Sequence, residues 1–469
     1  MAKDFIVAIE LGSSKMTGIA GRKNPDGSIS ILAVAKEDSA SYIRKGVAYN
    51  IERTAQGLSN IVSKLKNTLK TEIEQVYVGI GGQSIHSVKN SIVKELPLDC
   101  IVSQDMVNEL MDTNRSMEYK DCEILDAITQ EYNVDGHYED DPVGIQARHL
   151  EGNFLNVLWR RSFYRNLNKS LDNAGIKVAE MYLAPLTMAD CVLTEAEKRA
   201  GCLLVDLGAD TTTVSVYYRN KLRHIAVLPL GGSNVTKDLE SLQIDEINAE
   251  AMKLKHASAL TNEKDIDAEA TLPIDDDRTI LSRKFIQVVE ARMLEIVENV
   301  KYLVPHEFAD KLLGGIVLTG GGSNMKNVEK LFREVFCAEK VRIAKSTTLN
   351  INKKDSDVIL SEDGTTNTIL GLLAKGDMNC AGRAISETLF DEEEESGSEN
   401  TVSLDPTLAA TGTGAQPAAQ TAAQPAAVAE EEEEEEEKAP EPHKPTKFSR
   451  FFGSLKKFGS SIFEPDVNE

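Results

Sequence analysis

The sequence contains few cysteines and histidines, and neither type clusters. Its six cysteines include no Cys-x-x-Cys pair, and its seven histidines do not gather beside them. This spacing argues against a zinc site and a disulfide framework, and it is typical of reduced thiols in a cytosolic protein. No run of about 18 apolar residues occurs, so no membrane-spanning helix is predicted. The N-terminus also lacks the apolar stretch and cleavage site of a signal peptide.

Basic residues are outnumbered, and the excess of acidic residues is concentrated near the C-terminus. The formal net charge is −23 and the pI is about 4.9, which argues against a basic nucleic-acid-binding surface. Residues 391–443 hold 16 acidic residues and one Lys, whereas residues 444–469 hold five basic and three acidic residues. Subtracting these charges of −15 and +2 from −23 leaves −10 for the first 390 residues, as in an ordinary globular body.

Strand-like and helix-like patterns alternate through residues 1 to about 390, as they do in an α/β fold. The apolar residues of the helical stretches recur at three- and four-residue spacing. We expect strands at 5–10, 29–35, 75–80, 202–206, 213–218, 225–230 and 315–319, and helices at 52–69, at 278–302 and from about Val328.

Residues 391–446 differ in composition from the rest of the chain. The acidic runs Asp391–Glu395 and Glu430–Glu437 flank a stretch rich in Ala, Thr, Gln and Pro. Such a segment buries too little apolar surface to offset its ordering entropy, so we expect a disordered, self-repelling linker. The run of glutamates is interpreted as a soluble spacer, and a specific acidic docking motif is the alternative.

One pattern occurs twice, in Phe5–Ser14 and in Cys202–Asp210. Each copy is an apolar strand followed by an acidic residue, Leu, Gly and small or polar residues. The spacing is too long for a solenoid repeat and indicates a duplicated domain with two hairpins facing one cleft. A tight turn after such a strand presents backbone N–H groups to an anion, and the carboxylate can hold a hydrated divalent cation. One copy alone would be interpreted as an ordinary hairpin turn, but two copies favour a phosphate clamp.

Three further motifs are ambiguous by themselves. The segment Gly320–Ser323 follows a strand and precedes a helix, which suits a nucleotide phosphate or purine but also a simple turn. Gly231 and Gly232 lie between a strand and a helix start and allow the same two interpretations. Glu250 and Lys253 share one helical face, where a solvated ion pair is the alternative to a ligand site.

Taken in order, these motifs resemble the actin/Hsp70/sugar-kinase superfamily of ATP-binding folds, and within it the FtsA family of bacterial cell-division proteins. The narrower resemblance is carried by residues 124–151, which look like that family's inserted subdomain, by residues 230–253, and by the C-terminal tail. It covers residues 5 to about 376, plus the tail. It implies a two-lobed, actin-like (duplicated RNase H-like) α/β fold with a small inserted α+β subdomain, a disordered acidic linker and a C-terminal amphipathic helix.

The resemblance also implies ligand-binding residues for ATP and Mg²⁺. The first hairpin would hold phosphates through Glu10, Gly12, Ser13, Ser14 and Lys15, and the second through Asp206, Gly208, Thr211 and Thr212. The other nucleotide-binding residues would be Gly231 and Gly232, Glu250 and Lys253 near the ribose or base, and Gly320, Gly321, Gly322 and Ser323 near the adenosine. Glu10 and Asp206 would hold Mg²⁺, through water.

The same resemblance divides the chain into subdomains. Residues 1–83 and 164–200 would form subdomain 1A, 84–163 the inserted subdomain 1C, 201–235 and 305–390 subdomain 2A with a return to 1A, 236–304 subdomain 2B, 391–446 the linker, and 447–469 the membrane-targeting helix and C-terminus. Subdomain 2B would dock the C-terminal tail of FtsZ, and subdomain 1C would contact other divisome proteins.

Two positions depart from that family's pattern. Glu10 stands where Asp is usual, and Ala209-Asp210 stands where consecutive glycines are usual. The longer side chain of Glu10 would alter the metal geometry. The Asp210 carboxylate would repel phosphates unless it points away or shares the cation. No general base is evident, because the acidic residues at 190–197 fit helix-surface charges, so we assign no catalytic residue and expect at most slow ATP hydrolysis.

The segment Lys447–Phe463 has an aromatic face. At about 100° per residue, its seven large apolar side chains fall within an arc of about 140°, with basic side chains outside it. This pattern is typical of a helix that lies in the membrane plane, and its two glycines suggest that it folds on binding. Docking on a partner or on the protein's own body is the alternative. The residues assigned to membrane binding are Phe448, Arg450, Phe451, Phe452, Leu455, Lys456, Lys457, Phe458, Ile462 and Phe463.

We therefore expect an ATP-binding, actin-like adaptor that polymerises, tethers the tubulin-like FtsZ ring to the membrane and helps to recruit the divisome. Its location would be the cytoplasmic face of the bacterial cell membrane at the division septum. Its partners would include other copies of itself and the anionic membrane surface, but no nucleic acid. The alternatives are a phosphotransferase of the same superfamily, such as a small-molecule kinase, and a pilus-assembly actin-like ATP-binding protein.

Overall fold

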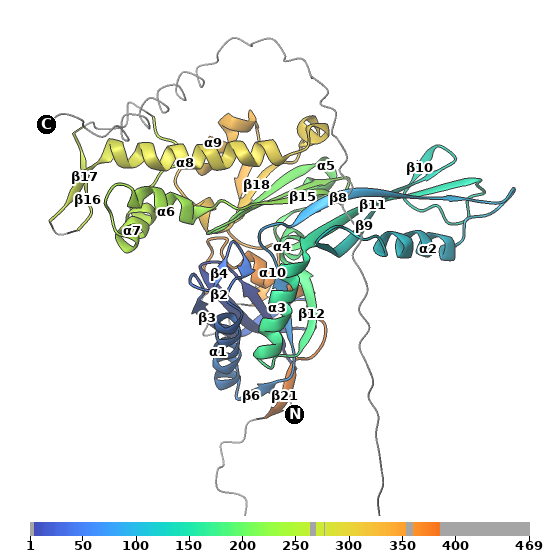
Figure 1. Ribbon diagram of the computed structural model, residues 1–469, viewed down its shortest axis with the longest axis horizontal. Helices are drawn as coiled ribbons and strands as arrows, with labels where there is room; N and C mark the ends of the chain where they lie inside the picture. The colour runs from blue at the N-terminus through green and yellow to red at the C-terminus, as the bar shows by residue number, and fades with distance from the viewer. Residues whose placement is uncertain (1–3, 263–268, 276, 353–359, 385–469) are drawn as a thin grey trace, which may run out of the picture. The chain divides into compact units, whose positions relative to one another are not determined.

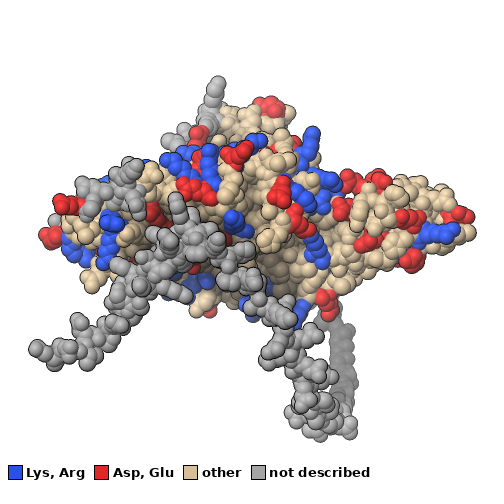
Figure 2. Space-filling model, turned by 90° about the horizontal axis from the view of Figure 1, so that it is seen from above, with Lys and Arg blue, Asp and Glu red and all other residues tan. Residues whose placement is uncertain are grey.

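The structure, a computed structural model, describes residues 4–262, 269–275, 277–352 and 360–384 (Figure 1). The expected linker at 391–446 and the expected amphipathic helix at 447–469 lie outside these residues. Within the described ranges, no helix is both long enough and apolar enough to cross a membrane. Lys, Arg, Asp and Glu are interspersed over the face that Figure 2 shows.

A mixed sheet is built around the first hairpin, with the strand order β12-β7-β1-β2-β3-β20. β1 pairs antiparallel with β2 and parallel with β7. Its strands are β1 (Ile6–Leu11), β2 (Lys15–Lys23), β3 (Ile29–Asp38), β7 (Val76–Ile80), β12 (Val178–Leu183) and β20 (Ile351–Asn352). Two short pairs accompany it: β4 (Ile43–Arg44) with β5 (Val47–Ala48), and β6 (Thr71–Ile73) with β21 (Ala381–Ala384).

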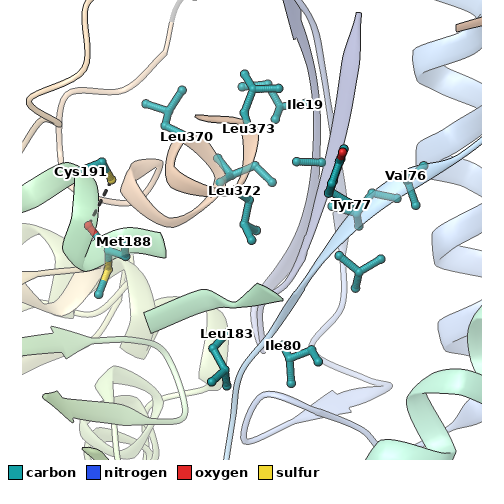
Figure 3. Close-up of a cluster of buried hydrophobic side chains, with 14 of the residues drawn as sticks. Ile19, Val76, Tyr77, Ile80, Leu183, Met188, Cys191, Leu370, Leu372 and Leu373 are labelled. Atoms are coloured by element: carbon teal, nitrogen blue, oxygen red, sulfur yellow. Dashed lines mark hydrogen bonds between the residues drawn. The ribbon is translucent and has the colours of Figure 1, made fainter. Parts of the chain in front are cut away.

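Helices cover this sheet closely because glycines in its strands leave room for them. A Cβ at Gly18 would lie 2.4 Å from Ile61 of α1, and a Cβ at Gly79 would lie 2.5 Å from Leu372 of α10. Figure 3 shows the leucines of α10 facing Ile19 and Tyr77 in the resulting core. These helices are α1 (Ile51–Leu69), α3 (Arg161–Asn173), α4 (Ala184–Val192) and α10 (Asn367–Lys375). The short α5 (Glu195–Ala200) follows α4 and packs instead against β14 (Thr212–Tyr218) of the second sheet.

A second sheet repeats the arrangement around the second hairpin, with the order β15-β14-β13-β18-β19. β13 pairs antiparallel with β14 and parallel with β18, as β1 does with β2 and β7. This shared order confirms the duplicated fold that the sequence predicted. The elements are β13 (Cys202–Leu207), β14 (Thr212–Tyr218), β15 (Lys221–Leu228), β18 (Gly315–Thr319), β19 (Val341–Ile343), α6 (Gly232–Glu240), α7 (Glu246–His256), α8 (Ser282–Leu303), α9 (Val328–Phe336), and the short β16 (Thr271–Pro273), β17 (Thr279–Leu281), η2 (His306–Lys311) and η3 (Gly321–Asn324).

Helix α8 begins later than the sequence predicted. The expected start was residue 278, but residues 279–281 form β17, which pairs antiparallel with β16. The apolar spacing of the helix continues into this strand, so periodicity alone could not separate the two. α8 then packs against α6 and α9 (Figure 1) and buries Phe285 and Val289 in the second core.

A small α+β unit lies between β7 and α3 in the chain and joins the second sheet. Its strands extend the order beyond β15 as β8-β11-β9-β10, and α2 packs on them. It has its own buried cluster, which includes Leu110, Leu150 and Phe154. The elements are β8 (His86–Glu95), α2 (Gln104–Arg115), β9 (Cys122–Val134), β10 (His137–Glu139) and β11 (His149–Arg160).

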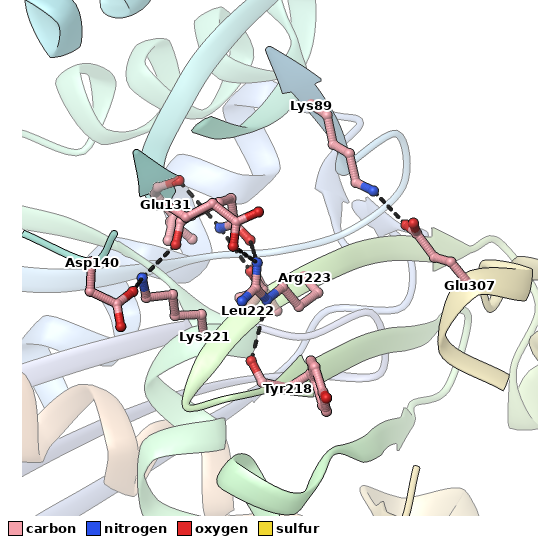
Figure 4. Close-up of polar contacts among 10 residues, drawn as sticks. Lys89, Glu131, Asp140, Tyr218, Lys221, Leu222, Arg223 and Glu307 are labelled. Atoms are coloured by element: carbon pink, nitrogen blue, oxygen red, sulfur yellow. Dashed lines mark hydrogen bonds and ion pairs between the residues drawn. The ribbon is translucent and has the colours of Figure 1, made fainter. Parts of the chain in front are cut away.

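Polar contacts fasten this α+β unit to the second sheet, where the backbone pairing of β8 with β15 is a single residue pair, Ala226 with His86. Figure 4 shows Lys221 reaching Asp140, with 2.6 Å between Nζ and Oδ1. Arg223 donates to the Gln130 side chain at 3.1 Å, and Gln130 donates back to the carbonyl of Leu222 at 3.1 Å. These contacts add to the buried apolar residues that the two parts share, among them Val157 of β11 and Ile225 of β15.

Replacing Arg223 by Met should lower the free energy of unfolding by about 1–3 kcal/mol. The substitution removes the hydrogen bonds of a partly buried guanidinium, and the Gln130 side-chain oxygen then has no donor. Amide exchange in β9 should become faster. Arg161→Met is the matched control, since its ion pair with Glu123 is exposed and should contribute less than about 1 kcal/mol. Equal losses in both variants, measured by urea unfolding, would contradict a special role for Arg223.

Candidate functional site

The two hairpins share a tight turn that only glycine permits. A Cβ at Gly12 would lie 2.6 Å from the carbonyl oxygen of Lys15, and a Cβ at Gly208 would lie 2.8 Å from that of Thr211. In the second turn the Gly208 N–H donates to the Thr211 carbonyl at 2.9 Å. In the first, the Gly12 carbonyl accepts from the Ser39 hydroxyl at 2.6 Å. The sequence pattern therefore corresponds to one backbone geometry built twice.

Glu10 and Asp206, the penultimate residues of β1 and β13, lie near each other. Burial, followed by repulsion from Asp206, raises the pKa of Glu10 to about 8. Burial also raises the pKa of Asp206 to about 6. Lys15 and a hydrogen bond from Thr368 act in the opposite direction on the Glu10 pKa. The structure thus brings Glu10, Lys15 and Asp206 near one another.

The helix start at Gly231 and Gly232 is occupied by the second hairpin. The Gly232 N–H donates to the Gly208 carbonyl at 3.0 Å, and the Ser233 N–H donates to the Ala209 carbonyl at 2.7 Å. A Cβ at Gly231 would lie 2.5 Å from the Ala209 carbonyl oxygen. These glycines therefore let the start of α6 dock directly on the hairpin turn.

Glu250 and Lys253 of α7 form more than a solvated surface pair. Lys253 Nζ lies 2.6 Å from Glu250 Oε2, and it also donates to Thr236 Oγ1 at 2.9 Å and to the Gly232 carbonyl at 3.1 Å. The Thr236 hydroxyl donates to Glu250 at 2.6 Å. The Lys253 side chain is only 10% exposed, so this network ties α7 to the start of α6 beside the second hairpin.

The glycines after β18 also contact the second hairpin. A Cβ at Gly320 would lie 2.3 Å from Asp206 Oδ1, and one at Gly322 would lie 3.0 Å from Leu207. Gly320 has φ +81°, in the left-handed region that glycine favours. The glycines lead into the 3-10 turn η3 rather than directly into a helix, and the Ser323 hydroxyl donates to the Gly320 carbonyl at 2.7 Å.

Two predicted phosphate ligands use their hydroxyls within the fold. Thr212 is buried and donates to the Leu230 carbonyl at 2.9 Å. The Ser13 hydroxyl accepts from the Gly46 N–H at 2.8 Å, which leaves its own proton available. Ser14 is exposed, and its carbonyl accepts from the Ser39 N–H at 3.3 Å. Ser13 and Ser14 therefore fit a phosphate site better than Thr212 does.

The two carboxylates suit a divalent cation that is shared with a phosphate. Mg²⁺ usually keeps several waters and takes only one or two carboxylates plus substrate phosphates. Glu10 and Asp206 provide that number, and repulsion between them is relieved when a cation lies between them. No group of three or more His, Cys, Asp or Glu side chains forms a metal site in the described part of the chain.

Comparisons with known proteins decide the family. The model of the "SHS2 domain inserted in FTSA" matches residues 82–158, and the model "Cell division protein FtsA" matches residues 203–361. The Cell division protein FtsA of Porphyromonas gingivalis is 32% identical over 353 residues, which cover 73% of this chain and 74% of that protein. The chain belongs to the FtsA family. The FtsA of Escherichia coli K12 is 26% identical over 350 residues, covering 71% of this chain and 82% of that protein.

A solved structure agrees with the fold. The PilM–PilN type IV pilus biogenesis complex has a TM-score of 0.53 at 14% identity, covering 78% of this chain and 97% of that chain. At this identity the likeness shows an actin-like fold alone. Membership of the FtsA family makes this chain a bacterial cell-division protein. The matched SHS2 domain contains β8, α2, β9, β10 and most of β11.

The acidic residues near 190, which the sequence offered as weak candidates for a base, form ion pairs in this FtsA-family body. Asp190 contacts Lys198 at 3.1 Å and Lys375 at 2.8 Å. Glu197 contacts Arg342 at 2.6 Å. Burial alone would raise the pKa of both carboxyls, but hydrogen bonds from these cations outweigh it, so the pKa of each carboxyl is lowered. Their contacts support the structural interpretation.

Thr368 is a site residue that sequence reasoning missed. It lies on α10, and its hydrogen bond to Glu10 lowers that carboxyl's pKa. No local motif marked it, because its relation to the first hairpin arises only when α10 packs against β1.

Proposed function

We propose that this chain is an ATP-binding adaptor that polymerises on the cytoplasmic face of the cell membrane at the division septum, tethers the FtsZ ring and helps to recruit the divisome. The observation that carries the adaptor role is the segment Lys447–Phe463, in an FtsA-family chain. Its large apolar side chains share an arc of about 140°, opposite basic residues. An acidic linker before it keeps the basic helix as the attractive contact with an anionic leaflet.

One such helix should bind weakly and reversibly. Full burial of one large apolar side chain contributes about 1.5–3 kcal/mol, but interfacial burial is shallow and the helix must fold on binding. Copies joined in a polymer would bind more firmly, because each bound tail raises the effective concentration of the next. Polymerisation and membrane attachment would therefore support each other.

ATP and Mg²⁺ are the proposed ligands of the two hairpins. The support is the repeated Gly-dependent turn and the pair of carboxylates with raised pKa, Glu10 and Asp206. Mg²⁺ would supply positive charge to the phosphates there, while this chain's backbone N–H groups and Lys15 orient them. ATP would act mainly as a conformational ligand that stabilises the polymerising state, and hydrolysis would be slow at most.

The subdomain bounds given above remain part of the proposal, with 236–304 as the docking surface for the FtsZ tail. In that segment α7 exposes Ile247 (82%) and Leu254 (77%), seven residues apart on one face. The inserted unit exposes Leu98 (67%) and Ile101 (62%), which suits contact with neighbouring copies or divisome proteins.

Co-sedimentation with liposomes tests the adaptor role. The full chain should pellet with vesicles that contain anionic lipid, at least about fivefold more than a chain truncated before Lys444, since the tail supplies the apolar contact. ATP with Mg²⁺ should increase pelleting of the full chain only. Phe458→Ser should reduce pelleting, whereas Ser454→Ala on the polar side should not. Equal pelleting of the full and truncated chains would refute the membrane role of the tail.

A further inference from the structure

Asp210, the residue that departs from the FtsA pattern of glycines, contacts the opposite side of the site. Its Oδ2 accepts a hydrogen bond from the backbone N–H of Lys45 at 3.1 Å, across 165 residues of sequence. Lys45 belongs to the turn between β4 and β5, beside the first hairpin, whereas Asp210 belongs to the second hairpin. One carboxylate therefore bridges the two halves of the candidate nucleotide site.

The turn between β4 and β5, whose Lys45 N–H donates to Asp210, has a fixed position. Lys45 has φ +51° and Gly46 has φ +73°, as in the two-residue turns that connect β-hairpins. A Cβ at Gly46 would lie 2.5 Å from the Cα of Gly82, and the Lys45 carbonyl accepts from the Gln83 N–H at 2.8 Å. The backbone around the turn is therefore packed too closely to move aside, and the donor for Asp210 has a defined position.

The two N–H groups of this turn serve both hairpins. The Gly46 N–H donates to Ser13 Oγ at 2.8 Å, in the first hairpin, while the preceding N–H, that of Lys45, donates to Asp210. Successive backbone N–H groups in such a turn form a concavity that favours an anion. In this structure the anion at the Lys45 N–H is the carboxylate of Asp210. The next N–H along the chain, that of Gly46, contacts Ser13, which is a proposed phosphate ligand.

The geometry points to Asp210 as a specificity-determining residue that makes the site favour a nucleoside diphosphate over a nucleoside triphosphate. This inference rests on the proposed nucleotide site. The Asp210 carboxylate adds negative charge to the turn of the second hairpin, four residues after Asp206, and a bound cation can neutralise only part of it. A triphosphate brings more negative charge than a diphosphate, so repulsion from Asp210 acts mainly on the triphosphate. If Asp210 moved away from the triphosphate, its hydrogen bond with the Lys45 N–H would be lost, and this loss would weaken triphosphate binding further.

Calorimetric titration with ADP and ATP, each with excess Mg²⁺, tests this inference on the full chain. Asp210→Asn keeps the shape and an acceptor for the Lys45 N–H but removes the charge, and Asp210→Gly removes both. Both variants should bind ATP at least tenfold more tightly than the wild type, which is about 1.4 kcal/mol, while ADP affinity changes less than threefold. Asp135→Asn is the control, since its carboxylate also accepts backbone N–H groups but lies in the inserted unit.

The outcomes separate this inference from the proposed function. If both nucleotides bind and the ratio of their affinities stays within twofold in both variants, Asp210 does not set the preference, and the nucleotide site stands. If Asp135→Asn shifts the ratio equally, the effect is general charge and the inference is overturned. If neither nucleotide binds wild type or variant at millimolar concentration, the nucleotide site itself is refuted. Amide exchange of Lys45 should be at least tenfold faster in Asp210→Gly, and an unchanged rate would refute the bridging contact.

Discussion

Glu10→Gln should weaken the binding of Mg²⁺-ATP by about 10–100-fold, the loss typical of removing a group that orients a metal's ligands. Glu10 is the penultimate residue of β1 and lies near Asp206, and it would hold Mg²⁺ through water. The amide keeps the size of the side chain but cannot attract the cation. Calorimetry on wild type and variant measures the loss, and Glu37→Gln, on the surface beside Lys64, is a matched control.

The pH dependence of this binding gives a second signature. In the free protein the pKa of Glu10 is about 8, so at pH 7 most molecules must release a proton before the carboxylate can attract Mg²⁺. The wild-type affinity, divided by that of Glu10→Gln, should therefore rise by about tenfold per unit between pH 6.5 and 7.5 and level off above pH 8. A ratio independent of pH would contradict a role for ionised Glu10.

The same substitution should stabilise the protein in the absence of ligand. The pKa of Glu10 is raised from 4.5 to about 8 on folding, so the folded state binds a proton that the unfolded state has lost at neutral pH. That uptake lowers stability progressively as the pH rises from about 4.5 to 8, by up to about 3 kcal/mol at pH 7. Glu10→Gln removes this term. A variant that loses Mg²⁺-ATP affinity but gains resistance to urea cannot be explained by misfolding.

Leu372→Ala should lower the free energy of unfolding by about 2–5 kcal/mol, the range for a leucine deleted from a rigid core. Leu372 of α10 (Figure 3) is fully buried. Its side chain fills the space that a Cβ at Gly79 in β7 would take. The surrounding strands and helices are close-packed, so the cavity can collapse only partly. Urea unfolding followed by circular dichroism measures the change.

Leu313→Ala is the control for this substitution, because Leu313 is 71% exposed and lies between β18 and η2. Its loss should be below about 0.5 kcal/mol. A comparable loss in both variants would show that burial on the sheet does not set the effect. Nucleotide binding of folded Leu372→Ala should be nearly unchanged, since Leu372 lies in the core rather than at the turns.

The sequence predicted the paired hairpins because their chemistry is local. An apolar strand, an acidic residue and a glycine are adjacent in the chain, and the close approach of Gly12 to Lys15 explains why a second copy needs the same residues. The helix at 52–69 was equally predictable from its apolar spacing, and in the structure Asn50 caps it. These features depend on neighbours within a few residues.

Contacts made only by tertiary packing were not predictable. The hydrogen bond from Lys45 to Asp210 joins segments 165 residues apart, and it involves a backbone N–H that no side-chain motif can mark. Thr368 likewise meets Glu10 only through the packing of α10. The docking of α6 on the second hairpin, where the Gly232 N–H donates to the Gly208 carbonyl, also arises only from tertiary packing.

The placement of α10 has a consequence for folding during synthesis. α10 covers a sheet whose first strand is β1, and the chain just after it returns to the N-terminus, where the Cys380 N–H donates to the Phe5 carbonyl at 2.8 Å. The strands β13 to β19 of the second sheet are all made before α10. The sheet around β1 begins to leave the ribosome first, but its core should be completed last, because Leu372 of α10 is synthesised only after the second sheet. Chains interrupted before residue 367 should expose that unfilled apolar face and be the ones that chaperones retain.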